Sequence, residues 1–293
     1  MPLKVLDINA PVPILALLYG YSGAGKTSFA LSCPRTIFLA SERAAVMAAV
    51  QDHIRRGGAS PFRVLEPTTR DDVFEFCDDL EKPAMRSQID TVVFDSFTDI
   101  QNRFLLQATS DRVDAAIAAK RSNPGSKDQP EQQDWQRVLM PGLRLLIRLQ
   151  NLGYNVIVTA HVRDWIDPID RPRVRALMAS RRNADPNMIP KKYYPAARGQ
   201  IQDTLPHYFN LCAFMRKEPN GTRRMYTREQ ATFFAKTQFG GLPDVIENPT
   251  YERIMLGING QLTEALITQP NPWAELNLLP EGEENAIVLE PGE

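Results

Sequence analysis

Short hydrophobic runs alternate along this chain with segments in which apolar residues recur at helical spacing. The hydrophobic runs are rich in aliphatic and β-branched residues and end at turn-forming or polar residues, so they predict buried strands. They cover residues 14–18, 36–40, 90–95 and 155–161, and a weaker strand is predicted at 62–65. The segments with helical spacing cover residues 28–32, 43–56, 69–80, 97–120 and 131–152. Strands that alternate with helices predict an α/β fold in which a mostly parallel central sheet is flanked by helices.

A polar stretch with prolines and a glycine, residues 121–130, separates the two longest helical segments and predicts a loop. The second of these segments contains Pro141 and Gly142. A proline inside a helix removes a backbone hydrogen bond and clashes with the preceding turn. We therefore expect this helix to be kinked or split in two.

The regular alternation stops after His161. Residues 162–198 carry nine basic and four acidic side chains among scattered prolines, which indicates a long basic loop inserted into the domain. Two later runs, 211–217 and 223–227, flank Asn220-Gly221 and predict a C-terminal antiparallel hairpin, with a further strand at 232–236. No basic residue follows Arg253, and glutamates accumulate instead. We predict one domain over residues 1–257, then an acidic and flexible tail over 258–293.

Composition narrows the class of protein without naming a partner. The formal net charge is −1 and 43% of residues are hydrophobic, so any contact with nucleic acid must come from a local patch. The three cysteines, Cys33, Cys77 and Cys212, have no paired spacing, which argues against a zinc site or a disulfide framework. No signal-peptide pattern and no apolar run of about 20 residues is present, so we expect a soluble cytoplasmic protein with no membrane partner.

The first hydrophobic run leads into a glycine-rich loop. Its spacing is Gly-x-x-x-x-Gly-Lys-Thr, between a predicted strand and a predicted helix, and this is typical of a phosphate-binding loop. Small residues let successive backbone N–H groups surround a polyphosphate, and the helix N-terminus adds partial positive charge. Lys26 would reach the β- and γ-phosphates, while the Thr27 hydroxyl would bind Mg²⁺. The sequence therefore predicts binding of ATP with Mg²⁺ by Gly20, Tyr21, Ser22, Gly23, Ala24, Gly25, Lys26, Thr27 and Ser28.

Three further strands end in polar residues, at the sheet edge where ligands of parallel α/β proteins gather. Asp95 ends a hydrophobic run as the acid of a Walker B strand does, and we expect it to hold Mg²⁺ through water. Glu42 is a candidate for polarising the attacking water; alternatively it complements a helix dipole. His161 could hydrogen-bond the γ-phosphate, or it could be structural.

Five segments carry a resemblance to a known family: residues 20–27, 38–42, 92–96, 156–161 and 235–243. With them the chain resembles the RecA-like branch of P-loop ATPases, and in particular the phage-encoded recombination and single-strand annealing proteins with an AAA domain. The resemblance implies a RecA-like P-loop NTPase fold and ATP hydrolysis stimulated by DNA. It also implies a homo-oligomer that binds single-stranded DNA in the cytoplasm of the host cell.

The same resemblance implies roles for single residues. Glu42 corresponds to the catalytic carboxylate, His161 to the γ-phosphate sensor, and Lys236 to a lysine that reaches the neighbouring subunit's nucleotide. Gln238 stands where helicase relatives have an arginine, so an arginine from the neighbouring subunit is not expected there. The loop that begins at residue 162 corresponds to the single-strand-binding loop, although it could also be an ordinary connection. Its basic residues are Arg163, Arg171, Arg173, Arg175, Arg181, Arg182, Lys191 and Lys192.

Two other functions remain open at this point. A helicase loader or motor-type ATPase would use the same fold for translocation and form defined hexamers. A nucleotide-gated binding module would not depend on hydrolysis, and its acidic tail could recruit a single-strand-binding protein. A small-molecule kinase is disfavoured because neither an arginine-rich lid nor an acceptor-site motif is evident.

Overall fold

A computed structural model describes residues 12–123, 125–166, 192–199 and 201–263. Its main feature is a nine-stranded sheet in the order β11-β9-β8-β1-β5-β4-β2-β3, with β10 paired to β8. The strands are β1 (Leu15–Gly20), β2 (Thr36–Ala40), β3 (Arg63–Leu65), β4 (Thr91–Asp95), β5 (Asn155–Ala160), β8 (Leu211–Lys217), β9 (Arg223–Tyr226), β10 (Lys236–Thr237) and β11 (Val245–Glu247). The six strands from β8 to β3 are parallel, and β9, β10 and β11 extend them antiparallel. The predicted mostly parallel sheet and its C-terminal hairpin are confirmed.

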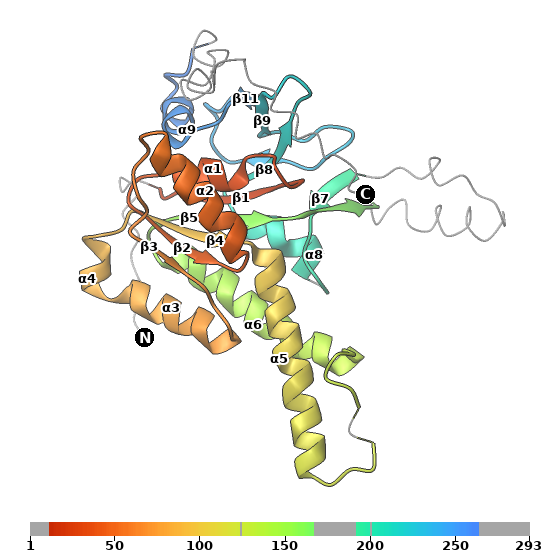
Figure 1. Cartoon of the computed structure of the whole chain (residues 1–293). Helices are drawn as coiled ribbons and strands as arrows, with labels where there is room; N and C mark the ends of the chain where they lie inside the picture. The colour runs from red at the N-terminus through yellow and green to blue at the C-terminus, as the bar shows by residue number, and fades with distance from the viewer. Residues whose placement is uncertain (1–11, 124, 167–191, 200, 264–293) are drawn as a thin grey trace, which may run out of the picture.

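Helices cover both faces of this sheet (Figure 1). They are α1 (Lys26–Leu31), α2 (Arg43–Arg55), α3 (Arg70–Glu81), α4 (Pro83–Arg86), α5 (Phe97–Ala118), α6 (Gln132–Asn151), α8 (Ile201–Thr204), a 3-10 turn (Leu205–Tyr208) and α9 (Tyr251–Ile258). Leu17 and Tyr19 of β1 pack in one core with α3, α5 and α6, whereas Ala16 and Leu18 pack in a second core with α1, α2 and α9. Successive strand residues point to opposite faces, so β1, β2, β4 and β5 are buried on both faces, whereas β3 at the sheet edge leaves Arg63 and Leu65 exposed.

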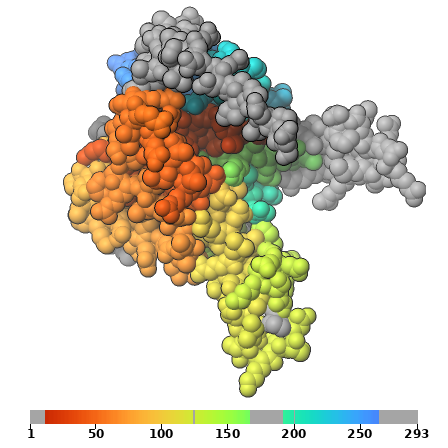
Figure 2. All heavy atoms as spheres, viewed as in Figure 1, coloured from red at the N-terminus to blue at the C-terminus, as the bar shows by residue number. Residues whose placement is uncertain are grey.

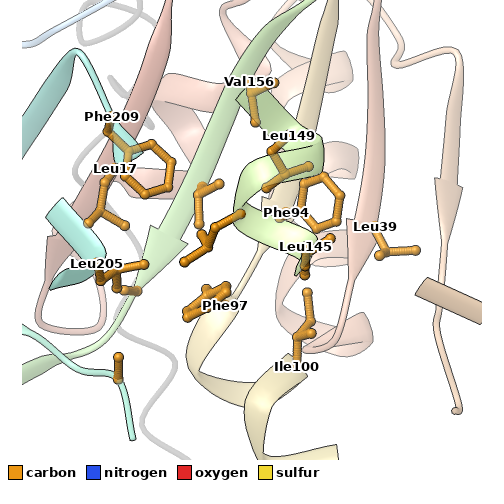
Figure 3. Close-up of a cluster of buried hydrophobic side chains, with 14 of the residues drawn as sticks. Leu17, Leu39, Phe94, Phe97, Ile100, Leu145, Leu149, Val156, Leu205 and Phe209 are labelled. Atoms are coloured by element: carbon orange, nitrogen blue, oxygen red, sulfur yellow. The ribbon is translucent and has the colours of Figure 1, made fainter. Parts of the chain in front are cut away.

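Helix α6 runs without interruption through Pro141 and Gly142, so the helix is not split in two. Val138, Leu145 and Leu149 form one buried stripe on both sides of the proline, and α6 packs along α5. Figure 3 shows Leu145 and Leu149 beside Phe94 and Phe97. Tertiary packing of this stripe outweighs the missing hydrogen bond at the proline.

The ends of α5 and α6 that are joined by residues 119–131 project from the body of the molecule (Figures 1 and 2). Arg112 and Asp134 fasten this projection, with Arg112 Nε 3.0 Å from a carboxylate oxygen of the fully buried Asp134. Asp134 also caps its own helix by accepting from the Glu131 backbone N–H at 2.9 Å. A buried charge needs such pairing because its desolvation is costly.

Two predictions about the later part of the chain are wrong in detail. Residues 162–198 are not irregular throughout, since β6 (Val162–Trp165) and β7 (Lys192–Pro195) form a small antiparallel sheet. The strand predicted at 232–236 shares only Lys236 with β10, a two-residue strand that pairs with Leu211 and Cys212, because β9 occupies the same edge of β8 from Phe214 onward. Among the described helices, none is both long and apolar enough to cross a bilayer.

Leu145→Ala tests whether the α6 stripe carries the packing of this face. Leu145 is fully buried, so the truncation should lower the free energy of unfolding by about 2–5 kcal/mol. Ile147→Ala, two residues along the same helix at a side chain that is 49% exposed, should change it by less than about 0.5 kcal/mol. Denaturant titration of both variants checks this, and equal losses would contradict the assignment.

Candidate active site

The loop between β1 and α1 is shaped by its glycines. Gly23 has φ 76° and Gly25 has φ 97°, backbone conformations that glycine adopts without steric cost. At Gly20 a Cβ atom would lie 2.1 Å from the carbonyl oxygen of Met215 on β8, so only glycine fits there. The loop therefore turns tightly from the end of β1 into α1, as a phosphate-binding loop requires.

Lys26 and Thr27, at the start of α1, take up positions that suit a polyphosphate and a metal ion. The Lys26 ammonium donates to the carbonyls of Gly20 and Tyr21, at 2.9 and 3.0 Å, so its side chain arches back over the loop. Burial lowers the pKa of Lys26, although the charges of Asp95 and Glu42 oppose this. The Thr27 hydroxyl donates to Asp95 Oδ2 at 2.7 Å.

Asp95 ends β4 in the middle of the sheet and is 5% exposed. Its second carboxylate oxygen accepts a hydrogen bond from the hydroxyl of Thr159 on β5. The Ser41 backbone N–H, just after β2, donates to the Asp95 carbonyl at 2.8 Å. The Thr27 hydroxyl and the Asp95 carboxylate together offer oxygen ligands side by side. Oxygen ligands are those that Mg²⁺ prefers, so these residues fit the predicted ion.

His161 links two acids at the neighbouring strand ends. Its Nε2 lies 3.1 Å from Glu42 Oε1 and 3.1 Å from Asp99 Oδ2. Glu42 occupies the N-cap position of α2 but makes no capping hydrogen bond with its side chain, which faces His161 instead. Asp99, in the first turn of α5, also accepts a hydrogen bond from the Ser96 hydroxyl.

These contacts shift the ionisation of all three groups. The hydrogen bond to Asp99 raises the pKa of His161, and it holds the pKa of Asp99 well below its usual range. Burial, followed by a hydrogen bond to Asp99, raises the pKa of Glu42. Perturbed acids and bases that gather in a cleft are typical of functional sites.

One cavity of about 240 Å³ lies between the phosphate loop and the neighbouring strand ends. The phosphate loop forms one wall, and Glu42, Asp95 and His161 form the other.

A family model described as AAA domain matches residues 13–239, which include this whole cavity. The chain belongs to the AAA domain family. Among curated proteins, a search finds none that matches.

Membership of the AAA domain family indicates a nucleotide-binding ATPase of the P-loop type. Such ATPases generally use ATP and Mg²⁺. The Lys26 ammonium suits the phosphates of ATP, and the oxygens of Thr27 and Asp95 suit Mg²⁺. The geometry also agrees with the expectation that Glu42 and His161 lie at the same sheet edge.

Two of the basic residues predicted to bind DNA, Arg163 and Lys192, lie in the described part of the chain, and both contact other residues of the same domain. The Arg163 guanidinium lies over the Tyr194 ring and 3.6 Å from Asp203. Lys192 pairs with Glu229 at 2.8 Å. The other predicted DNA-binding residues lie outside the described part of the chain: Arg171, Arg173, Arg175, Arg181, Arg182 and Lys191.

Lys236 does not line the cavity. It lies on β10 opposite Cys212, near the start of β8, whereas the phosphate loop lies beside the other end of that strand, where Met215 pairs with Gly20. A contact with a neighbouring subunit's nucleotide therefore stays a prediction.

Three residues of this region, Asp99, Thr159 and Arg223, were not predicted from the sequence. Asp99 stands one helical turn after Asp95, so its place in the first turn after a strand end could have suggested it. Thr159 lies two residues before His161 within a buried strand, and strand alternation could have placed it toward Asp95. Arg223 begins β9, far along the chain, and only the tertiary structure brings it to the cavity.

His161→Gln tests the ionisation of this cluster through stability. A raised His161 pKa stabilises the fold fully below the unfolded value of about 6.5, and the gain is lost as pH rises through the folded value. The positive charge of Lys26 opposes the rise in the His161 pKa. The lowered pKa of Asp99 changes the stability only at acid pH. The loss of Tm caused by the substitution should be about 1–2 °C greater at pH 6 than at pH 8.5, because the pair is partly exposed.

His53→Gln serves as the control for this measurement. Burial lowers the pKa of His53, so its contribution should change with pH in the opposite direction. Thermal unfolding of both variants across this pH range would contradict the assignment if the two behaved alike.

Proposed function

We propose that this AAA domain protein hydrolyses ATP at the described cavity and uses the ATP-bound state to bind single-stranded DNA. The observation that carries the proposal is the juxtaposition of Glu42 and His161 with the phosphate loop in one cavity. Each residue comes from a different part of the chain. A loop that binds phosphate alone would not need a carboxylate and an imidazole aimed at the same place.

Each residue has a defined task in this proposal. The backbone N–H groups of the loop and the Lys26 ammonium neutralise the phosphate oxygens, and Glu42 orients and polarises the attacking water. The raised pKa of Glu42 makes it a better proton acceptor than an exposed carboxylate. Mg²⁺, when bound near Thr27 and Asp95, further neutralises charge that develops on the phosphoryl oxygens.

His161 is suited to report the γ-phosphate to the DNA-binding segment. It is followed directly by β6, and β6 and β7 form a two-stranded stem that flanks residues 167–191 in the sequence. β7 also contacts the phosphate loop, because the ring centroids of Tyr21 and Tyr193 lie 5.7 Å apart. A shift of His161 from Asp99 toward a phosphate would therefore move the stem at both strands.

Single-stranded DNA is the proposed ligand of the segment because six basic residues lie between 171 and 191. Contacts of Arg and Lys with phosphates supply much of the affinity of such proteins. Recombination or annealing of phage type, homo-oligomeric assembly, and recruitment of a single-strand-binding protein by the acidic tail are further proposals that rest on the resemblance.

Glu42→Gln tests the catalytic assignment. It keeps the size of the side chain but removes the carboxylate, so kcat for ATP hydrolysis should fall about 10²- to 10⁴-fold while ATP affinity is retained. Glu66→Gln is the control, since Glu66 does not line the cavity and pairs with Arg43 at 3.6 Å. Unchanged turnover in Glu42→Gln would favour a non-hydrolysing binding module, and strand-dependent turnover by hexamers would favour a motor.

The double charge reversal Arg173→Glu and Arg175→Glu tests the DNA-binding segment. It should weaken binding to single-stranded DNA and reduce the slope of log K against log salt by about 1.4, the value for two lost phosphate contacts. ATP affinity should not change. Lys120→Glu with Arg121→Glu, an equal change of charge at the end of the α5 projection, should leave strand binding intact. Fluorescence anisotropy at several salt concentrations would contradict the assignment if both double variants bound alike.

A further inference from the structure

A second cavity of about 370 Å³ adjoins the phosphate loop and is not lined by Glu42 or His161. Helices α1 and α2 form two of its walls, and the chain between β11 and α9 forms the third. Gly25, Ser28 and Arg223 line both this cavity and the smaller one. The two cavities therefore meet at the start of α1.

Arg223 stands at this junction. Its backbone is fixed by Asn248, whose side-chain oxygen accepts from the Arg223 N–H at 3.2 Å and whose N–H donates to the Arg223 carbonyl at 2.6 Å. The side chain lies against Gly25, where an added Cβ atom would be 2.5 Å from Arg223 Cδ. A larger residue at position 25 would therefore displace the Arg223 side chain.

The Arg223 guanidinium makes no ion pair within the described residues. Asp52, an acid whose charge acts on it, is already paired with Arg56 at 2.8 Å. Burial and the like charge of Arg56 lower the pKa of Arg223, so an anion placed here would relieve both costs. Arg224, the next residue, differs because it is bound to Glu247 at 2.8 Å.

The walls of the larger cavity are partly apolar and partly polar, and two charged residues that line it, Asp52 and Arg56, are paired with each other. Phe29, Ala49 and Pro249 provide apolar surface, and Asn248 and His53 provide polar groups. Since the Asn248 side-chain oxygen is used by Arg223, its NH₂ group is the part that can donate to a ligand. Apolar walls with a few polar groups are typical of sites for small organic ligands.

We propose that the larger cavity binds the ribose and base of the nucleotide and that Arg223 binds its α-phosphate at the junction of the two cavities. Lys26 lies toward the β- and γ-phosphates, so a nucleotide in the loop directs its α-phosphate toward Ser28 and its nucleoside into this cavity. The proposal rests on nucleotide binding by the phosphate loop. It makes Arg223 a positive charge supplied to the phosphates by the same chain.

The first experiment measures ATP affinity by calorimetry in Arg223→Ala, Arg223→Lys and Arg224→Ala. A charge-assisted hydrogen bond is lost in Arg223→Ala, so ATP should bind about 10- to 100-fold more weakly. Arg223→Lys keeps the charge and should recover part of the loss, whereas Arg224→Ala should bind as the wild type does. ATP affinity unchanged in Arg223→Ala would overturn the role of this residue.

The second experiment fills the cavity without touching the phosphates. Ala48 lines only the larger cavity and is exposed on α2, so Ala48→Trp should leave the fold intact. The Ala48→Trp substitution should lower the affinity for ATP about tenfold or more but leave the affinity for inorganic triphosphate unchanged. Equal effects on ATP and triphosphate, or no effect on either, would overturn the assignment of this cavity.

Lys26→Ala separates this proposal from the one on which it rests. If Lys26→Ala abolishes binding of both ATP and triphosphate while Arg223→Ala and Ala48→Trp bind normally, the phosphate loop is functional and only the nucleoside site is wrong. If Lys26→Ala binds both ligands as the wild type does, nucleotide binding by the loop itself fails.

Discussion

The hydrogen bonds of Asp95 hold the functional edge of the sheet together. One carboxylate oxygen accepts from Thr27 at the start of α1, and the other accepts from Thr159 on β5. The main-chain carbonyl of the same residue accepts from Ser41, next to Glu42. A nearly buried carboxylate must satisfy its oxygens, and here its partners come from three different segments. The phosphate loop, β5 and the end of β2 are therefore positioned relative to one another by a single residue.

Two side chains from distant parts of the chain, His161 and Arg223, line the same cavity as the phosphate loop. His161 lies on the side of Glu42 and continues directly into β6, the first strand of the basic segment. Arg223 lies where this cavity meets the larger one, at the start of β9, the second strand of the hairpin that extends the sheet. A ligand in the loop would touch the two groups at different points along its length. The two proposed roles, hydrolysis beside His161 and recognition of the nucleoside beside Arg223, therefore involve different residues of the two cavities.

Much of the fold follows from local patterns. Four strands that are buried on both faces, β1, β2, β4 and β5, appear as hydrophobic runs, and the Asn220-Gly221 turn predicts the hairpin because few other residues adopt its conformation. Local patterns could not decide whether the helix α6 continues through Pro141, or where the strand near residue 236 lies. The first depends on how the buried stripe of α6 packs on α5. The second depends on how much of the β8 edge is already taken by β9.

The sequence by itself determined the phosphate loop and the strand-end positions of Glu42, Asp95 and His161, because each rests on spacing within one strand–loop–helix unit. Only the tertiary structure decided which of these groups touch, that Asp99 joins them, and that Arg223 reaches the loop from almost 200 residues away along the chain. Spacing fixes the edge of the sheet at which a side chain lies. Contacts between side chains depend on strand order and register, which are set by packing across the whole domain.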